Sequence, residues 1–293
     1  MGALGKGPMV GKELYALMGM DILDLWRSCR LLGAVRAEIV GRRYLRFDKA
    51  VEGYARLSPS IQREFTTYTV VGLAREEAHV LARARELRKE IEEISGAKME
   101  MARGVVGEVI RRLGDLGPEV EAGACFIIGG DVPLGMAHSD PRPERSTGEL
   151  VVGSDLDILV ITSGLREEAV RRLDEEIYDQ KCALLRRPRK EEIDYLIKGI
   201  EKVREQTRFG TFEEMVACKI LHESAFLGGS KAIYKEVEGL LEEAGIPARL
   251  RALEDLAKAK RAEAERYLLE RCRITPEEYL RLFTTSDEFS EVF

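Results

Sequence analysis

Two aspartates separated by one apolar residue stand at the start of an apolar stretch in the sequence GSDLDILVIT, residues 153–162. Residues at positions i and i+2 of a β-strand project to the same face, so Asp155 and Asp157 are expected to hold their carboxylates side by side. Two adjacent negative charges repel each other unless a cation lies between them. Hard oxygen ligands suit Mg²⁺, and substrate phosphates commonly complete its coordination shell. The pair therefore predicts a metal site that handles a phosphorylated substrate.

Further groups precede and follow the aspartate pair. The apolar segment FIIGG ends in Gly129 and Gly130, and the later segment EIDYLI contains Asp194. Glycines let the backbone approach phosphate oxygens, and backbone amides of a turn can bind those anions. The 37 positions from Asp157 to Asp194 accommodate a helix and a return to a neighbouring strand. Ser154, directly before the pair, either donates to a phosphate or caps a turn.

Taken together, these residues resemble the nucleotidyltransferase superfamily that includes DNA polymerase β, kanamycin nucleotidyltransferase and the poly(A)-adding enzymes. The family pattern is an apolar strand ending in glycines, an Asp-x-Asp strand and a further carboxylate on a neighbouring strand. The resemblance covers residues from about 97 to 198 and implies that Asp155, Asp157 and Asp194 are both catalytic residues and metal ligands. It implies one or two Mg²⁺ ions, with Mn²⁺ as an alternative, and ATP or another nucleoside triphosphate as substrate. A nucleoside monophosphate would pass to an acceptor hydroxyl with release of pyrophosphate, and Asp194 would serve the second metal or act as base.

The resemblance also implies nucleotide contacts from Gly129, Gly130 and Ser154, and from a lysine of a helical domain beside the sheet. Lys219 and Lys231 are the candidate lysines, and Tyr234 is a candidate for base stacking. For each of them an ordinary structural role is the alternative, because surface lysines are usually only solvated and tyrosines often lie in cores.

The chain departs from the family pattern in two ways. Gly130 stands where a serine is usual, and the insert 136–150, MAHSDPRPERSTGEL, places Asp155 25 positions after Gly130. The insert forms either a flap, with Arg142, Arg145 or His138 meeting phosphate, or a long hairpin.

Other interpretations of the Asp-x-Asp sequence fit less well. A haloacid-dehalogenase site places its strand before the pair and needs Thr or Val two residues after it. A calcium loop needs polar ligands and a glycine where this chain has Ile158 and Leu159. Two solvated aspartates on an edge strand remain a structural alternative. The ordered set of glycine pair, aspartate pair and later aspartate favours the metal site.

The N-terminal region predicts a helix at Lys12–Met18, a turn at GMD, a second helix at Ile22–Leu32 and a hairpin with Gly41 at its tip. This pattern resembles a winged-helix module, and residues 11–50 hold three more Lys and Arg than Asp and Glu. The resemblance implies a nucleic-acid partner. The candidate contacts are Arg27 and Arg30 on the second helix and Arg42, Arg43 and Arg46 on the hairpin.

The remaining periodicity predicts a multidomain α+β protein. A long charged helix is expected at Arg75–Ile94, a break at Ser95 and Gly96, and a further helix from Ala97 to Leu116. The long helix is expected to serve as a connector, as a homodimer arm or in packing within the monomer.

An α/β region is expected after the helices. Its strands are predicted at Ala124–Ile128, at DLDILVIT and at EEIDYLIK, with a helix at Arg166–Leu185. Helices are expected again from Gly210 onward, with a capping box at Thr211 and Glu214 and breaks at Gly228, Gly229 and GIPARL. The predicted domains are a winged-helix-like module at 1–56, a helical connector at 57–96, a small mixed-sheet catalytic core at 97–205 and a helical domain at 206–293.

The composition limits the class of protein. The chain has 293 residues, 33% of them charged, and a net charge of −6, which argues against a disordered or globally basic protein. No stretch approaches the roughly 18 apolar residues of a membrane span. A cytoplasmic protein without a membrane partner is expected. The cysteines lie far apart and predict thiols in a reducing compartment: Cys29, Cys125, Cys182, Cys218 and Cys272.

Three functions are consistent with these patterns. The first is the metal-dependent nucleotidyltransferase described above. The second is a DNA-binding transcriptional regulator that uses the nucleotidyltransferase fold as a nucleotide sensor or an inactive scaffold. The third is a toxin-type nucleotidyltransferase that modifies a protein or transfer RNA. Three clustered carboxylates favour catalysis over a scaffold, because a scaffold gains nothing from their repulsion. The sequence fits the first and the third equally.

Overall fold

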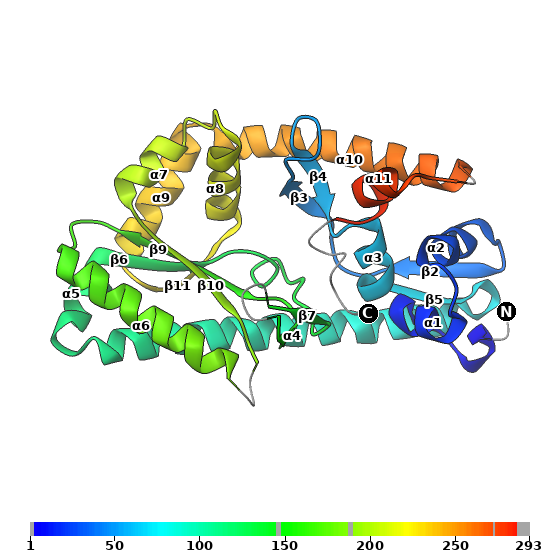
Figure 1. Ribbon diagram of the computed structural model, residues 1–293, viewed down its shortest axis with the longest axis horizontal. Helices are drawn as coiled ribbons and strands as arrows, with labels where there is room; N and C mark the ends of the chain where they lie inside the picture. Colours follow the sequence, from blue (N-terminus) through cyan, green and yellow to red (C-terminus); the bar gives the residue numbers. More distant parts are fainter. Residues whose placement is uncertain (1–2, 145–147, 187–189, 272, 286–293) are drawn as a thin grey trace. The chain divides into compact units, whose positions relative to one another are not determined.

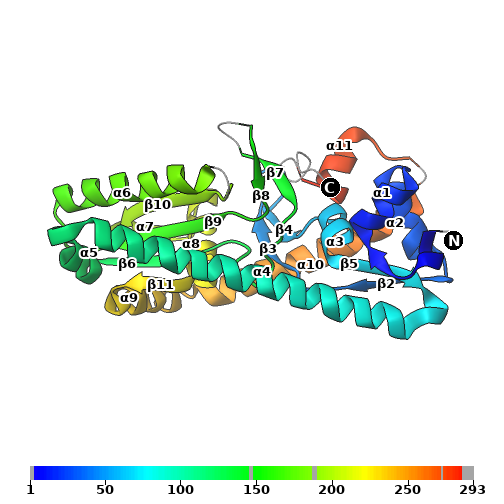
Figure 2. The same ribbon diagram turned by 90° about the horizontal axis from the view of Figure 1, so that it is seen from below.

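The computed structural model describes residues 3–144, 148–186, 190–271 and 273–285. The protein is α+β, and its chain divides into two compact units. The first unit comprises residues 1–92 and 252–293, and the second comprises residues 93–251. Figures 1 and 2 show the elements of both units in two perpendicular views.

The second unit is built on a four-stranded mixed sheet with the order β10-β9-β6-β11. Strands β9 and β10 are parallel, and β6 runs antiparallel to β9 and β11. The parallel pair is joined by helix α6, since parallel strands need a crossover. The bounds are β6 (Ala124–Ile128), β9 (Leu156–Thr162), α6 (Glu167–Leu185), β10 (Ile193–Gly199) and β11 (Ala225–Gly229). The three predicted strands and the predicted helix before the third are confirmed.

Helices cover both faces of this sheet. Leu156, Ile158 and Val160 of β9 alternate onto the face that packs against α4 and α6, in a shared hydrophobic core. Figure 1 shows α5 and α6 on that side and α7, α8 and α9 on the other. Because side chains alternate along a strand, Asp157 projects to the α7–α8 side. The helix bounds are α4 (Glu77–Arg112), η3 (Gly114–Leu116), α5 (Gly117–Gly123), α7 (Ile200–Gln206), α8 (Phe212–Glu223), α9 (Lys231–Glu243) and α10 (Ile246–Glu270).

The predicted helix break at Ser95 and Gly96 is wrong, because α4 runs without interruption through both residues. Ser95 is buried, and its hydroxyl accepts a hydrogen bond from the Ala137 amide over 3.1 Å. A glycine inside a helix costs only about 1 kcal/mol relative to alanine. The buried stripe that includes Ala102 and Val105 outweighs this penalty by packing α4 into the core.

Strand β11 was not predicted from the sequence, which placed only a break between helices at Gly228 and Gly229. Both glycines belong to β11 and pair with β6. A Cβ on Gly228 would lie 3.1 Å from Val106 Cγ1, and one on Gly229, whose φ is +80°, would overlap the Ala124 carbonyl. Glycine has low β propensity. The close packing requires glycine at these positions, and for that reason the sequence shows no strand pattern there. The capping box at the start of α8 is confirmed, with Thr211 and Glu214 each bonding the backbone amide of the other.

The first unit contains a three-stranded sheet, a separate hairpin and several helices, which include parts of α4 and α10. The two predicted N-terminal helices are confirmed. Gly19, with φ +59°, ends the first helix, and the Asp21 carboxylate caps the start of the second. The sheet has the antiparallel order β1-β5-β2, and β3 pairs with β4. The bounds are η1 (Ala3–Lys6), β1 (Met9–Val10), α1 (Gly11–Met18), α2 (Ile22–Leu31), β2 (Val35–Ile39), β3 (Tyr44–Phe47), β4 (Ala55–Ser58), α3 (Ile61–Tyr68), β5 (Thr69–Leu73) and η2 (Ala74–Glu76).

The hairpin predicted around Gly41 is wrong in its pairing. The strand before Gly41, β2, pairs with β5, whereas the strand after it, β3, pairs with β4. Strand β5 is buried along its whole length. It therefore offers β2 a long-range partner with far more apolar burial than a local hairpin would provide. The local hairpin forms one strand later, between β3 and β4.

C-terminal residues complete the core of the first unit. The ring of Phe283 packs edge-on against Trp26, with 5.8 Å between centroids, and Leu268 belongs to the same buried cluster. This segment contains the end of α10, α11 (Pro276–Glu278) and the π-helical turn η4 (Tyr279–Phe283). Residues 206–251, by contrast, belong to the second unit.

Four of the five cysteines are free thiols, as predicted: Cys29, Cys125, Cys182 and Cys218. Cys272 lies outside the described residues. Among the helices that the structure describes, none is long and apolar enough to cross a membrane.

Candidate metal centre

Three predicted carboxylates come together at one end of the sheet in the second unit. Asp155 directly precedes β9, Asp157 is its second residue, and Asp194 is the second residue of β10. Asp157 and Asp194 are register partners on the two parallel strands. One carboxylate oxygen of each of the three lies within 4.8 Å of the others. We call these residues the carboxylate triad.

The triad concentrates negative charge in a partly buried position. Burial, together with the charges of Asp155, Asp131 and Asp194, raises the pKa of Asp157 to about 8. Burial also raises the pKa of Asp155, with Asp194 and Asp131 adding to the effect and the Arg142 guanidinium opposing it. Three hard oxygen donors under mutual repulsion suit a divalent ion such as Mg²⁺ or Mn²⁺. The triad could therefore hold a metal ion.

The predicted glycine pair lies against the triad. The Gly129 amide donates to the backbone oxygen of Asp157 over 2.9 Å. Gly130 has φ +70°, and a Cβ there would overlap Asp157 Oδ2. Only glycine at this position lets the Asp157 carboxylate pack against the backbone.

Ser154 is buried and has two partners inside the protein. Its hydroxyl accepts from the His138 amide and donates to Asp131 Oδ2, each over 3.2 Å. These contacts link Ser154 to residues distant in the sequence and differ from the turn cap that was the structural alternative. They also fix Asp131, a fourth carboxylate near the triad, which directly follows Gly130 in the sequence.

The insert 136–150 forms a hairpin together with the residues that follow it. Strands β7 (Pro141–Pro143) and β8 (Leu150–Val152) pair antiparallel. Lys98 of α4 anchors β8, because its Nζ donates to the Val152 carbonyl over 3.1 Å and pairs with Glu191 at 2.6 Å. His138 is buried, and Arg145 lies outside the described residues. The insert therefore contains β7 and the start of β8, and β7 carries Arg142.

Two basic side chains contact the triad, and one of them also pairs with Glu192. Arg142 Nη2 lies 3.2 Å from Asp155 Oδ2 and 2.8 Å from Glu192 Oε2. Lys181 of α6 places its Nζ 3.1 Å from Asp194 Oδ1. The pKa of Glu192 is raised by burial, which Arg142 opposes. The one available sequence signal is that Glu192 stands two positions before Asp194.

The predicted nucleotide-binding residues of the helical segment lie on α8 and α9. Lys219 pairs with Glu223 one helical turn away, at 2.7 Å. Lys231 is exposed at the start of α9. The ring of Tyr234 packs against Phe226 with 5.5 Å between centroids, which corresponds to its structural alternative.

The predicted nucleic-acid-binding arginines of the first unit differ in their surroundings. Arg27 donates to the carbonyls of Leu268 and Arg271 over 2.7 and 2.6 Å. Arg30 is exposed and lies 3.9 Å from Glu265. Arg42 is exposed and Arg46 half-buried. Of the five, Arg30 and Arg42 have the most exposed side chains.

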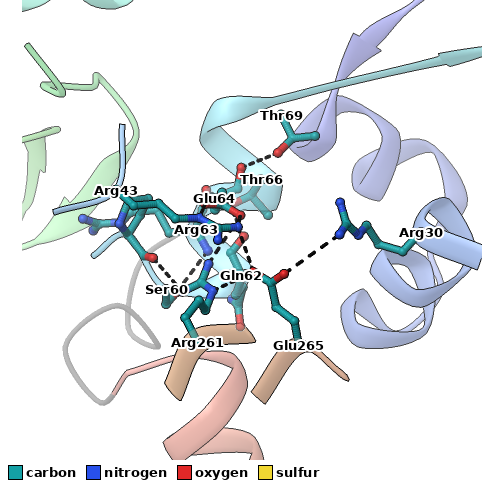
Figure 3. Close-up of polar contacts among 11 residues, drawn as sticks. Arg30, Arg43, Ser60, Gln62, Arg63, Glu64, Thr66, Thr69, Arg261 and Glu265 are labelled. Carbon is teal, nitrogen blue, oxygen red and sulfur yellow. Dashed lines mark hydrogen bonds and ion pairs between the residues drawn. The ribbon is translucent and has the colours of Figure 1, made fainter. Parts of the chain in front are cut away.

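Arg43 belongs to a buried polar network (Figure 3). Its guanidinium donates to both Glu64 oxygens over 2.5 and 2.7 Å and to Glu265 over 2.7 Å. Arg261 of α10 donates to Glu265 over 2.9 Å and to the Pro59 carbonyl over 3.0 Å. We call Arg43, Glu64, Arg261 and Glu265 the ion network. It ties the segment just before β3 to α3 and α10.

No protein-family model matches this chain. A comparison with curated protein sequences gives no significant match either.

The buried amine of Lys198 predicts a pH-dependent stability. Lys198 lies on β10 and donates to Gln206 over 2.7 Å, and burial lowers its pKa from 10.5 to about 8. Between these values this amine binds more protons in the unfolded chain than in the folded one, so Lys198 contributes a rise in the free energy of unfolding with pH. We expect this rise, roughly 2–3 kcal/mol from pH 8 to pH 10.5, to be absent in Lys198→Met. Urea unfolding followed by circular dichroism measures it.

The exposed Lys202 on α7 provides the control for this prediction. Its side chain is 60% exposed, so Lys202→Met should keep the wild-type pH dependence. An unchanged pH dependence in Lys198→Met would show that the buried amine is not its source.

Proposed function

We propose that the second unit is a metal-dependent nucleotidyltransferase. It would move a nucleoside monophosphate from a nucleoside triphosphate to an acceptor hydroxyl, with release of pyrophosphate. The observation that carries the proposal is the carboxylate triad on two adjacent parallel strands, with the glycine backbone packed against Asp157. Carboxylates in this arrangement suit a metal that also contacts phosphates.

The triad residues would hold one or two Mg²⁺ ions, or Mn²⁺ in their place. The bound ion would neutralise charge on the phosphates as pyrophosphate leaves. Three carboxylate oxygens within 4.8 Å of one another fit this role, since the donor set consists of hard oxygens alone.

The chemistry asks the protein to position phosphates and to accept one proton. The acceptor oxygen forms a bond to the α-phosphorus, and the bond from that phosphorus to the oxygen bridging to the β-phosphorus breaks. Pyrophosphate leaves with the bonding electron pair. Asp194 is the triad member that takes the acceptor's proton in this proposal, because its side chain is 52% exposed and open to an incoming substrate.

The glycine pair contributes to phosphate binding through one amide. The Gly129 amide already donates to the Asp157 carbonyl. The phosphate contact therefore falls to Gly130, whose backbone lies against the Asp157 carboxylate.

Labelled nucleotides test the proposal directly. The purified protein is incubated with each α-³²P-labelled nucleoside triphosphate, Mg²⁺, and either cellular RNA or cellular protein. We expect label in one of these fractions and its complete loss after EDTA. A γ-³²P label should not transfer, because the γ-phosphate leaves within pyrophosphate. Transfer of the γ label would identify a kinase instead, and α-label transfer that persists in EDTA would exclude the metal mechanism.

A further inference from the structure

Arg142 of the β7–β8 hairpin holds its guanidinium beside the carboxylate triad. Nη2 lies 3.2 Å from Asp155 and 2.8 Å from Glu192, and Nε donates to the Gly153 carbonyl over 2.9 Å. The side chain of Glu192 is 4% exposed and that of Arg142 is 16% exposed. The guanidinium is therefore fixed from two sides by groups of the fold.

The Nη2 atom of Arg142 is buried and has no hydrogen-bond acceptor among the described residues, although it is ion-paired with both carboxylates. The carboxylate oxygens are close enough for charge attraction but are not aligned with the N–H groups. A buried donor without an acceptor is costly. An anionic oxygen supplied by a ligand would satisfy it.

The position of Arg142 also makes its charge repel a metal ion bound at the triad. A divalent ion on Asp155 and the guanidinium would repel each other, because both approach the same carboxylate. A phosphate group between them removes the conflict. Arginine binds phosphate through a fork of N–H donors, and Mg²⁺ binds it through oxygen. Without phosphate, the metal ion and Arg142 thus compete for the Asp155 carboxylate. With a phosphate between them, both bind it, and each favours the binding of the other.

We infer that Arg142 binds phosphate oxygens of the metal-bound nucleotide and thereby couples metal binding to nucleotide binding. The inference rests on the proposed function, because it takes a nucleoside triphosphate as the ligand. It gives the insert a specific role: the hairpin, anchored to α4 through Lys98, presents a phosphate-binding arginine to the triad.

Two binding measurements on Arg142→Ala test the inference without any turnover. Mn²⁺ alone is titrated by electron paramagnetic resonance, and α,β-methylene-ATP is titrated calorimetrically at saturating Mn²⁺. We expect Mn²⁺ alone to bind about 3- to 10-fold more tightly, because a competing cation is gone. The nucleotide should bind about 10- to 100-fold more weakly, because a charge-assisted contact is lost. An arginine that only supports the hairpin would weaken both or change neither.

Two further variants keep the test sharp. Arg142→Lys retains the charge beside Glu192 but lacks the fork, so it should lose nucleotide affinity with metal affinity near that of the wild type. This variant carries the test alone if Arg142→Ala does not fold. Arg166→Ala removes an arginine that pairs with Glu119 elsewhere in the second unit, and should change neither affinity.

The outcomes separate the inference from the proposed function. If the wild type binds the nucleotide only with metal, and both Arg142 variants bind it as tightly, the inference is overturned and the proposed function stands. If the wild type shows no metal-dependent nucleotide binding, both the proposed function and the inference are contradicted.

Titrations with pyrophosphate and with AMP locate the contact. A loss of affinity in Arg142→Ala for pyrophosphate places Arg142 on the leaving group, and a loss for AMP places it on the α-phosphate. Unchanged binding of both ligands contradicts the inference.

Discussion

Replacing Asp157 with asparagine should abolish metal-dependent nucleotide transfer and, at the same time, stabilise the second unit. The carboxamide is a poor metal ligand, so we expect Mn²⁺ affinity and transfer to fall by at least about 100-fold. Stability should move in the opposite direction, because burial and the charges of Asp155, Asp131 and Asp194 disfavour the ionised carboxylate.

The stability gain should depend on pH with a definite sign. The pKa of Asp157 is raised from 3.8 to about 8, so the wild type is most stable below about pH 4 with respect to this group and loses that stability as pH rises to 8. The asparagine variant does not titrate there. Its advantage should be small near pH 4.5 and reach roughly 2–4 kcal/mol at pH 8. Differential scanning calorimetry in EDTA measures it.

Asp179 on α6 provides the matched control. Its side chain is exposed, so Asp179→Asn should alter neither the calorimetric profile nor transfer. Full transfer activity in Asp157→Asn would place the chemistry elsewhere. A variant less stable than the wild type at pH 8 would contradict the electrostatic account of the triad.

Removing Glu64 should destabilise the first unit by roughly 3–5 kcal/mol, the usual cost of leaving buried charge unpaired. Glu64 is 6% exposed and accepts two hydrogen bonds from Arg43, and one of its oxygens lies 3.4 Å from Arg261 (Figure 3). Burial lowers the pKa of Arg261, and Glu64 offsets that effect. In Glu64→Ala, Glu265 alone would face both guanidinium groups.

The single tryptophan makes this loss measurable in isolation. Trp26 is buried in the core of the first unit, so urea unfolding followed by its fluorescence reports on that unit. Glu64→Gln keeps the volume and one acceptor and should lose less stability than alanine. Glu86→Ala removes a 67% exposed partner of Arg83 and should cost less than about 1 kcal/mol. Equal losses in Glu64→Ala and Glu86→Ala would show that burial of the network adds nothing.

Local periodicity predicted the strands that carry the triad, and the family resemblance selected Asp194 as its third member. Asp155 and Asp157 follow the two-residue period of a strand, and a helix of ordinary length returns the chain so that Asp194 lies in register with Asp157. The glycine pair could be placed for the same reason, because it directly ends β6. These features depend on spacing within one segment or on a single crossover.

Features that depend on pairing between distant segments could not be predicted from local sequence patterns. Strand β2 pairs with β5 rather than across Gly41, because the buried β5 supplies a partner more than twenty residues away. Arg142 was a candidate phosphate contact, but its ion pair with Asp155 and that of Lys181 with Asp194 could not be predicted from local sequence. In β11, close packing requires glycines, and these residues are not typical of a strand, so the sequence pattern did not predict one.

The packing of Phe283 and Leu268 beside Trp26 determines the order in which the chain can fold during synthesis. The second unit is one continuous segment, residues 93–251, and all of its residues are available before the first unit is complete. The first unit must wait for residues made some 250 positions after Trp26, since its core lacks Phe283 until then. Domains usually fold in the order in which they emerge from the ribosome. We therefore expect the N-terminal residues of this protein to emerge first and to finish folding last.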